Sequence, residues 1–299
     1  MASASATQSA VRIEPRIANI LFATDFSPCS ERALPYASML AKQHRATLHL
    51  IHVAGPYPLV GPLGAPYADV ERENEDARRR LQALSRSSEM AFRHECSVHR
   101  GTVSEVVCRL VEDRTIDVVV MATHGRRGVR QFVLGSVAEQ VFRSVGCPVL
   151  TIGPGARIAG PASGRFSTIL AALDLSPGSR KVFAFAHAFA KTNTSALVLF
   201  HTVPWSPERQ ADNPTYLDDA VVTCKRQLEY MLPTDLPRAD ISIKIGSPAE
   251  MILQTAEDRN ADLIVIGARR GLRLATHNPW AVAHEVVCGA SCPVLTVGH

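Results

Sequence analysis

The chain of 299 residues lacks long apolar runs, long basic runs and paired-cysteine motifs. No apolar stretch approaches the roughly 18 residues of a membrane helix, which argues against a membrane span. The formal charge of +4 is small and dispersed, which argues against a nucleic-acid partner. The seven cysteines are scattered, and no cluster of His, Cys and carboxylates has metal-site spacing. We therefore interpret the cysteines as reduced thiols, with the equivalent Cys147 and Cys292 serving packing.

The N-terminus also lacks the features of a signal peptide. Its first residues, MASASATQSA, have neither a charged start nor an apolar core. We expect residues 1–15 to form a disordered tail and the protein to be cytoplasmic. The composition, 46% hydrophobic and 20% charged, is that of a globular protein with enough apolar side chain for two cores.

The sequence does contain one repeat of the size of a domain. Asp25-Phe-Ser-Pro recurs as Asp174-Leu-Ser-Pro, and later segments recur 145 positions apart, as Gly101 with Gly246, Asp117 with Asp262 and Cys147 with Cys292. A repeat this long is a whole domain rather than a solenoid unit. We predict a first domain at residues 16–153, a linker at 154–165 and a second domain at 166–299. Differences between the two copies then indicate where function lies.

Each half alternates short apolar runs with helical patterns, which is typical of βαβ units and a parallel sheet. We predict first-half strands at residues 19–23, 47–53, 96–100, 118–122 and 149–152, and residues 263–267 repeat the fourth of these. The predicted fold class is α/β, with two tandem, doubly wound, Rossmann-like parallel sheets of five strands each. The last strands of the halves are matched and would otherwise be exposed edges, so we predict that they pair with each other.

Local signals predict the helices. Ser27 before Pro28 indicates an N-cap and a first helical position, and Ser176 before Pro177 indicates the same in the second half. An apolar stripe follows the first of these signals, at Ala33, Tyr36, Ala37, Leu40 and Ala41. A charged and largely solvated helix is predicted over residues 68–94. The connections at residues 54–66 and 203–214 are long enough to be binding or lid segments.

Three segments of the first half converge on the carboxyl edge of its predicted sheet, where doubly wound folds bind ligands. Thr24 and Asp25 follow the first strand, Val53 ends the second, and Gly135 and Ser136 begin a helix beyond the fourth. A helix start offers unpaired amides and a positive dipole end to phosphate, and glycine permits close approach. The pattern predicts a phosphate-binding segment beside a carboxylate that can bind a sugar.

These features together resemble the universal stress protein family, over nearly the whole chain as a tandem pair. The resemblance is carried by Asp25-Phe-Ser-Pro, His52-Val53, Met121-Ala-Thr-His-Gly125, Gly135-Ser136 and the closing Cys-Pro-Val-Leu strands. ATP-binding members carry Gly-x2-Gly-x9-Gly-Ser/Thr, and Ala122 occupies the first glycine position here. The resemblance implies a site for ATP or another adenine nucleotide, with any Mg²⁺ arriving on the nucleotide. The implied site residues are Ala23 and Val53 at the adenine, Asp25 at the ribose, and Met121, Ala122, Gly125, Gly135, Ser136 and Val137 at the phosphates. Thr24, next to Asp25, is also expected in the site.

The second half departs from this pattern. Arg270, Trp280 and Ala281 stand where the first half has Gly125, Gly135 and Ser136. We therefore predict a degenerate site without nucleotide. Simpler structural roles also fit several residues: local backbone bonding for Asp25 and Asp174, structural hydrogen bonds for His52 and His201, and a solvated loop for His124, Arg126, Arg127 and Arg130.

The leading functional hypothesis is a cytoplasmic stress-response protein that binds nucleotide and acts through conformation or partners. No residue is predicted to be catalytic, and at most weak ATP hydrolysis is expected. The alternatives are a ligand-free scaffold for protein interaction and a nucleotidyl-transfer enzyme, although the SGGxDS and HxGH signatures of the latter are missing. The family resemblance implies dimerisation through the last strand, which a tandem chain can satisfy internally; a homodimer and a protein partner stay open.

Overall fold

A computed structural model of the chain describes residues 15–55, 67–87, 92–123, 135–156, 164–205, 207, 215–268 and 279–298. The first half contains β1 (Asn19–Ala23), α1 (Pro28–Glu31), α2 (Leu34–His44), β2 (Thr47–Ala54), α3 (Tyr67–Ser87), β3 (His94–Arg100), α4 (Val103–Asp113), β4 (Val118–Ala122), α5 (Ser136–Ser144) and β5 (Val149–Ile152). The second half contains β6 (Thr168–Ala172), α6 (Ser179–Asn193), β7 (Ala196–Val203), α8 (Tyr216–Met231), β8 (Ala239–Ile245), α9 (Pro248–Asp258), β9 (Leu263–Ala268), α10 (Pro279–Gly289) and β10 (Val294–Gly298). Within these ranges, no helix has both the length and the apolar character needed to cross a membrane.

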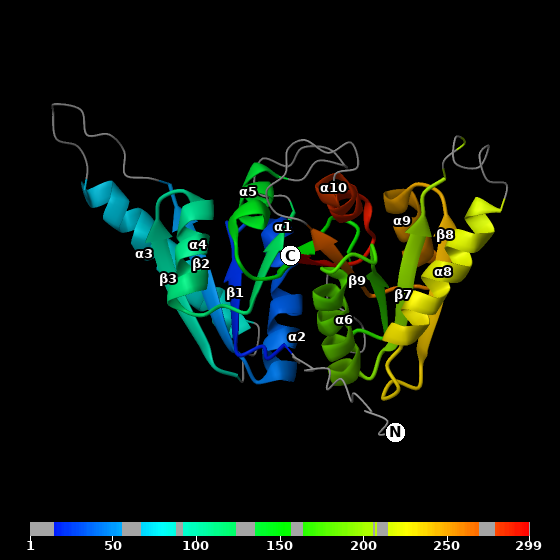
Figure 1. Ribbon diagram of the computed structural model, residues 1–299. Coiled ribbons are helices and arrows are strands. Elements are labelled where there is room, and N and C mark those ends of the chain that lie inside the picture. The colour runs from blue at the N-terminus through cyan, green and yellow to red at the C-terminus, as the bar shows by residue number, and fades with distance from the viewer. Residues whose placement is uncertain are drawn as a thin grey trace, which may run out of the picture.

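The strands form one continuous sheet in the order β3-β2-β1-β4-β5-β10-β9-β6-β7-β8. The two halves lie side by side with helices on both faces of this sheet (Figure 1). Strands within each half are parallel, whereas β5 and β10 pair antiparallel, with Leu150 opposite Leu295. The predicted pairing of the last strands is confirmed. The two predicted five-stranded sheets thus join into a single sheet of ten strands, and this pairing removes two exposed edges.

The predicted strands and the apolar helix stripe are confirmed, with small shifts at the strand ends. β1, β4 and β5 have the predicted bounds, β2 is one residue longer, and β3 begins two residues earlier. β4 and β9 are apolar almost throughout because helices cover both of their faces. The five residues of the stripe are each at most 1% exposed. They pack α2 and its preceding turn against the sheet.

Two helix predictions are wrong in their bounds. Ser27 does cap α1, because its hydroxyl accepts a hydrogen bond from the Ser30 amide at 3.1 Å. Ser176 caps no helix, since α6 begins only at Ser179 and Gly178 is its N-cap residue. The Asp174 carboxylate bonds the Ser176 amide and the Ser179 hydroxyl there, which holds a turn in place of a first helical turn. The helix predicted over residues 68–94 ends at Ser87, and His94 already belongs to β3.

The repeated aspartates Asp117 and Asp262 bind each half's first strand to the start of its fourth. Asp117 Oδ2 accepts hydrogen bonds from the amides of Ala18 and Asn19 at 2.7 and 2.9 Å. Asp262 Oδ2 accepts the equivalent pair, from Ser167 and Thr168 at 2.8 and 3.2 Å. The recurrence of these aspartates in the sequence therefore reflects a structural role at the amino edge of the sheet.

Asp117→Ala is expected to lower the free energy of unfolding by about 2–3 kcal/mol, because two amides lose a charged acceptor. Urea denaturation monitored by circular dichroism measures this change. Glu112→Ala is the matched control, because Glu112 is an exposed carboxylate of the neighbouring helix α4. The control variant should change the unfolding free energy by less than about 0.5 kcal/mol. Equal effects of the two substitutions would contradict the assigned role of Asp117.

Helices α2 and α6 connect the halves on one face of the sheet, near the middle of Figure 1. The Gln43 side-chain amide donates to Asn193 Oδ1 at 2.9 Å and to the Gly164 carbonyl at 3.0 Å. The ring centroids of His44 and Phe189 lie 5.6 Å apart, and burial lowers the pKa of His44. The halves are therefore joined both through the sheet and through the helices that cover it.

Candidate functional site

The carboxyl ends of β2, β1 and β4 lie next to one another in the sheet. β1 pairs with both neighbours and is the point at which the strand order reverses, where doubly wound sheets bind ligands. Ala23, Val53 and Ala122, all half-buried, are located at these strand ends. The structure therefore brings three of the predicted site segments to one edge.

The turn after β1 uses Thr24 and Asp25 to bond its own backbone. Thr24 is buried, and its hydroxyl accepts from the Phe26 amide and contacts the Ser30 hydroxyl, both at 2.9 Å. Asp25 Oδ1 accepts from the Ser27 amide at 3.0 Å. Asp25 is half-buried, so its carboxylate shapes the turn and still reaches the surface of the edge. Thr24 supports the turn, since its hydroxyl is already engaged on both sides.

The same turn in the second half is bonded differently. Asp174 is exposed, and its Oδ1 atom accepts from the Ser176 amide at 3.0 Å and from the Ser179 hydroxyl at 2.7 Å. Leu173 stands where the first half has Thr24, so no hydroxyl precedes the aspartate to engage this serine. The Asp174 carboxylate therefore bonds the Ser179 hydroxyl, whereas in the first half the Thr24 hydroxyl bonds the corresponding Ser30 hydroxyl.

Both turns contain a residue with left-handed backbone directly after the aspartate. Phe26 has φ 58° and Leu175 has φ 59°, although neither is glycine. Such a conformation costs about 1–3 kcal/mol and occurs disproportionately at ligand-binding turns. His52 and His201 support these turns through Nδ1, 2.8 Å from the Thr24 carbonyl and 2.7 Å from the Leu173 carbonyl. The structural interpretation of both histidines is confirmed.

A cluster of Arg80, Phe26 and His52, here called the Phe26 cluster, occurs in the first half and was not foreseen from the sequence. The Arg80 guanidinium carbon lies 4.3 Å from the centroid of the Phe26 ring, and its Nη2 atom donates to the Phe26 carbonyl at 3.4 Å. The His52 ring centroid lies 4.5 Å from that of Phe26. Arg80 belongs to the charged helix that was predicted to be largely solvated. Nothing in the sequence around Arg80 distinguishes it from the other charged residues of this helix or indicates its contact with Phe26.

The segment that carries most of the predicted phosphate motif, residues 124–134, lies outside the described residues. Gly125 belongs to it, as do His124, Arg126, Arg127 and Arg130. Both ends of the segment are described, and the Gly135 amide donates to the Thr123 carbonyl at 2.8 Å. The Thr123 amide in turn donates to the Ile152 carbonyl at 3.1 Å. The expectation that the helix start offers unpaired amides is therefore wrong for Gly135, whose amide is bonded to the Thr123 carbonyl.

Helix α5 begins directly after Gly135. Gly135, the N-cap residue, has φ −59° and ψ 141° and provides no side-chain cap. The first amides of a helix have no acceptor within the helix, and here no capping side chain supplies one. Ser136 and Val137 form the start of the helix and are exposed, Val137 by 40%. Met121, by contrast, is only 5% exposed and packs in the core. The amides that can donate hydrogen bonds to an anion are those of Ser136 and Val137, and the positive end of the helix dipole strengthens this interaction.

The equivalent helix of the second half starts differently. α10 begins at Pro279, so the positions matching Gly135 and Ser136, Trp280 and Ala281, lie inside its first turn. Pro279 also removes one of the amides that a helix start would offer. Arg270 lies outside the described residues. The described differences all reduce the capacity of this half to bind an anion at the helix start.

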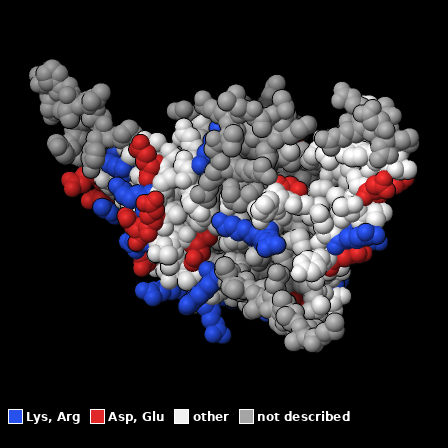
Figure 2. Space-filling model, viewed as in Figure 1, with Lys and Arg blue, Asp and Glu red and all other residues white. Residues whose placement is uncertain are grey.

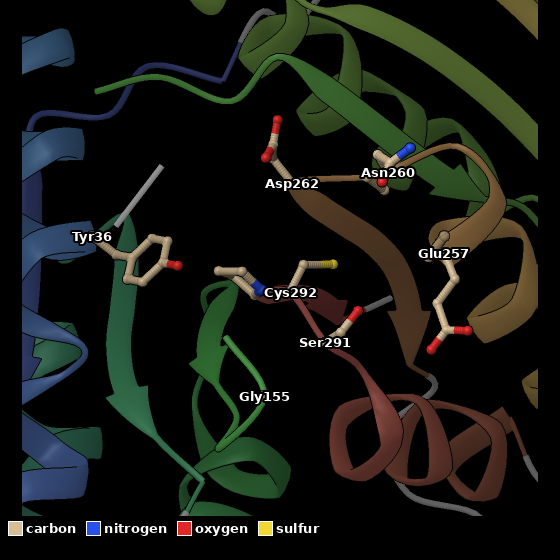
Figure 3. A pocket seen from close by; sticks show the side chains of 10 residues that line it. Tyr36, Gly155, Glu257, Asn260, Asp262, Ser291 and Cys292 are labelled. Carbon is tan, nitrogen blue, oxygen red and sulfur yellow. The ribbon is translucent and has the colours of Figure 1, made fainter. Parts of the chain in front are cut away.

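A hollow with a volume of about 310 Å³ lies where the halves meet. Figure 3 shows Tyr36 of α2 and Gly155 on one side, facing Asp262, Asn260 and Cys292 of the second half. It lies at the amino ends of β9 and β10, away from the carboxyl edge at which the second half would bind a ligand. Asp262 is engaged with the start of β6, as described above.

The interspersed surface charge (Figure 2) and the seven free cysteines agree with the predictions of dispersed charge and reduced thiols. On the face seen in Figure 2, basic and acidic side chains are interspersed over the first half. Burial raises the pKa of the Cys96, Cys108 and Cys224 thiols, which lowers their thiolate content. Among the described residues, no group of three His, Cys, Asp or Glu is placed to hold a metal ion.

These features define the class as a doubly wound α/β protein with two tandem copies of one domain. The model of the universal stress protein family matches residues 17–153 and 165–298, and the chain belongs to that family. A universal stress protein of Thermus aquaticus is 34% identical over 140 residues, which cover 44% of this chain and 98% of that protein. Universal stress protein MJ0531 of Methanocaldococcus jannaschii is 28% identical over 138 residues, covering 44% of this chain and 80% of that protein.

Solved structures show the same tandem fold. The crystal structure of a universal stress protein from Archaeoglobus fulgidus has a TM-score of 0.69 at 19% identity, covering 94% of this chain and 98% of that chain. A functionally unknown protein, PA1789 of Pseudomonas aeruginosa, has a TM-score of 0.66 at 17% identity, covering 95% and 94%. At these identities the likeness extends to the fold alone.

Proposed function

We propose that this protein is a cytoplasmic stress-response protein that binds ATP or a related adenine nucleotide in its first half. Its output is conformational or depends on a protein partner, and no residue is assigned a catalytic role. The observation that supports this most is the start of α5, where Ser136 and Val137 are exposed and the N-cap residue, Gly135, provides no side-chain cap. This helix start lies at the edge where β1 reverses the strand order.

The proposed contacts follow from the geometry of that edge. The amides of Ser136 and Val137, with the Ser136 hydroxyl, bind phosphate oxygens, and Gly135 leaves room for them. Asp25 accepts hydrogen bonds from the ribose hydroxyls, while Ala23 and Val53 line the adenine. Met121, Ala122 and Gly125 contribute backbone near the phosphates, and Thr24 acts by supporting the turn that carries Asp25.

A magnesium ion fits this proposal only as part of the nucleotide. The described residues offer no group of three metal-binding side chains, so the phosphates would supply most of its ligands.

The domains of the proposal are residues 16–153, which bind nucleotide, and residues 166–299, whose site is degenerate. The linker is residues 154–165. Pairing of β5 with β10 occurs within the chain, and assembly into a homodimer would use another surface.

One nucleotide per chain is the expected stoichiometry, although both halves share the strand order and the aspartate turn. α10 starts with Pro279 and carries Trp280 and Ala281 where phosphate would bind, so the second half lacks an equivalent site. Isothermal titration calorimetry with ATP should give a single site, and the same experiment on Asp25→Ala should show weaker binding. Asp174→Ala is the matched control and should leave the affinity unchanged. Two equivalent sites per chain would refute the proposal.

A ligand-free scaffold is the alternative, and it predicts a different outcome. Protein purified without added nucleotide can be denatured and its supernatant analysed by chromatography for adenine nucleotides. Nucleotide at up to one equivalent supports the proposal. If the protein carries no co-purified nucleotide and gives no calorimetric signal with ATP, ADP or AMP, the ligand-free scaffold is the better account.

A further inference from the structure

The turn that carries Asp25 is held by a contact that the second half lacks. The Phe26 cluster brings together three elements: Phe26 from the turn after β1, His52 from the end of β2, and Arg80 from α3. A guanidinium this close to an aromatic ring is attracted by the electrons of the ring. The hydrogen bond from Arg80 to the Phe26 carbonyl holds the backbone of the same residue.

The second half provides an internal comparison. Leu81 of α3 and Leu228 of α8 are both fully buried, and aligning the two helices on these leucines gives Gln227 as the counterpart of Arg80. Leu175 replaces Phe26, while His201 keeps the bond to the backbone that His52 makes. The half with the degenerate site therefore retains the strained turn and the histidine, but has neither the aromatic ring nor the cation.

Because the backbone of Phe26 is strained, the contacts that only the first half makes affect the turn that carries Asp25. Phe26 directly follows Asp25, so its left-handed backbone turns the chain and brings the Ser27 amide to the Asp25 carboxylate that it bonds. A non-glycine residue keeps such a conformation only where surrounding contacts enforce it. The His52 and His201 bonds are common to both turns, and in the first half the ring of Phe26 is held in addition by contacts from α3 and β2.

We propose that Arg80 and Phe26 are positioning residues for nucleotide binding, which hold Asp25 in its binding direction before the ligand arrives. This inference rests on the proposed function of the first half. Arg80 acts through the turn and not by contact with the nucleotide, because its guanidinium is engaged with the ring and carbonyl of Phe26. A site that is ordered in advance loses less freedom on binding, and this increases affinity.

Calorimetry of ATP binding to point variants tests the inference. Arg80→Met keeps an unbranched apolar side chain and removes the cation, and it should weaken binding about two- to fivefold, the range for an exposed cation over a ring. Arg80→Lys should restore most of the affinity, because an ammonium group also binds the ring face. Phe26→Leu, which installs the second-half residue, should weaken binding at least as much as Arg80→Met. Arg79→Met is the matched control, because it removes the same charge from a position 73% exposed on the same helix.

A double-mutant cycle with Asp25→Asn separates positioning from a general loss of stability. If Arg80 acts through Asp25, then Arg80→Met should have little further effect on affinity once Asp25 is replaced. Additive losses would overturn the inference, as would unchanged affinity in Arg80→Met or equal losses in Arg79→Met. Absence of ATP binding to the unsubstituted protein would instead refute the proposed function itself, so the two failures are distinguishable.

Discussion

Gly135→Trp is expected to weaken ATP binding a hundredfold or more while leaving the protein folded. The indole would occupy the space in front of the Ser136 and Val137 amides, and loss of two charge-assisted contacts at ~1.5–3 kcal/mol each corresponds to that factor. The substitution also installs the residue that the second half carries at Trp280. Gly135 has φ −59°, which any residue can adopt, so the backbone does not resist the change.

The matched control for this experiment is Gly146→Trp. Gly146 is an exposed glycine of the same half in the turn before β5, at the opposite edge of the sheet. No heavy atom lies within 4 Å of a Cβ built there. Its affinity for ATP should equal that of the unsubstituted protein, with circular dichroism confirming that both variants are folded. Unchanged affinity in Gly135→Trp would place the nucleotide elsewhere.

Leu150→Ala is expected to lower the free energy of unfolding of the whole chain by about 3–5 kcal/mol. Leu150 of β5 lies opposite Leu295 of β10 at the junction of the halves, and both side chains are fully buried. The sheet continues through this pair, so the cavity left by the substitution affects both halves. Urea denaturation should show one transition, shifted to lower urea.

Val222→Ala serves as the control, because Val222 of α8 is 49% exposed. Its unfolding free energy should change by less than about 0.5 kcal/mol. Two separate transitions, with only one of them shifted in Leu150→Ala, would show that the halves unfold independently. The junction would then be an association of two stable domains rather than a shared core.

The places of the candidate site residues in the fold were predictable where they depend on strand ends and helix starts. Asp25 after β1, Val53 at the end of β2 and Ser136 at the start of α5 follow from strand ends and helix starts, which local patterns reveal. Arg80 was not predictable, because nothing near it in the sequence indicates that α3 packs its guanidinium on Phe26. The role of Asp117 was likewise hidden, since its partners Ala18 and Asn19 are almost a hundred residues away.

The sequence by itself determined the two domains, the order of strands and helices, the buried stripe of α2 and the family. These depend on apolar periodicity and on a repeat, both of which can be read from neighbouring residues. Only the tertiary structure decided that the Gly135 amide is bonded to Thr123, and that β5 and β10 pair antiparallel with Leu150 opposite Leu295. Packing selects those contacts among many with similar local chemistry, so residues distant in the chain settle which groups remain available to a ligand.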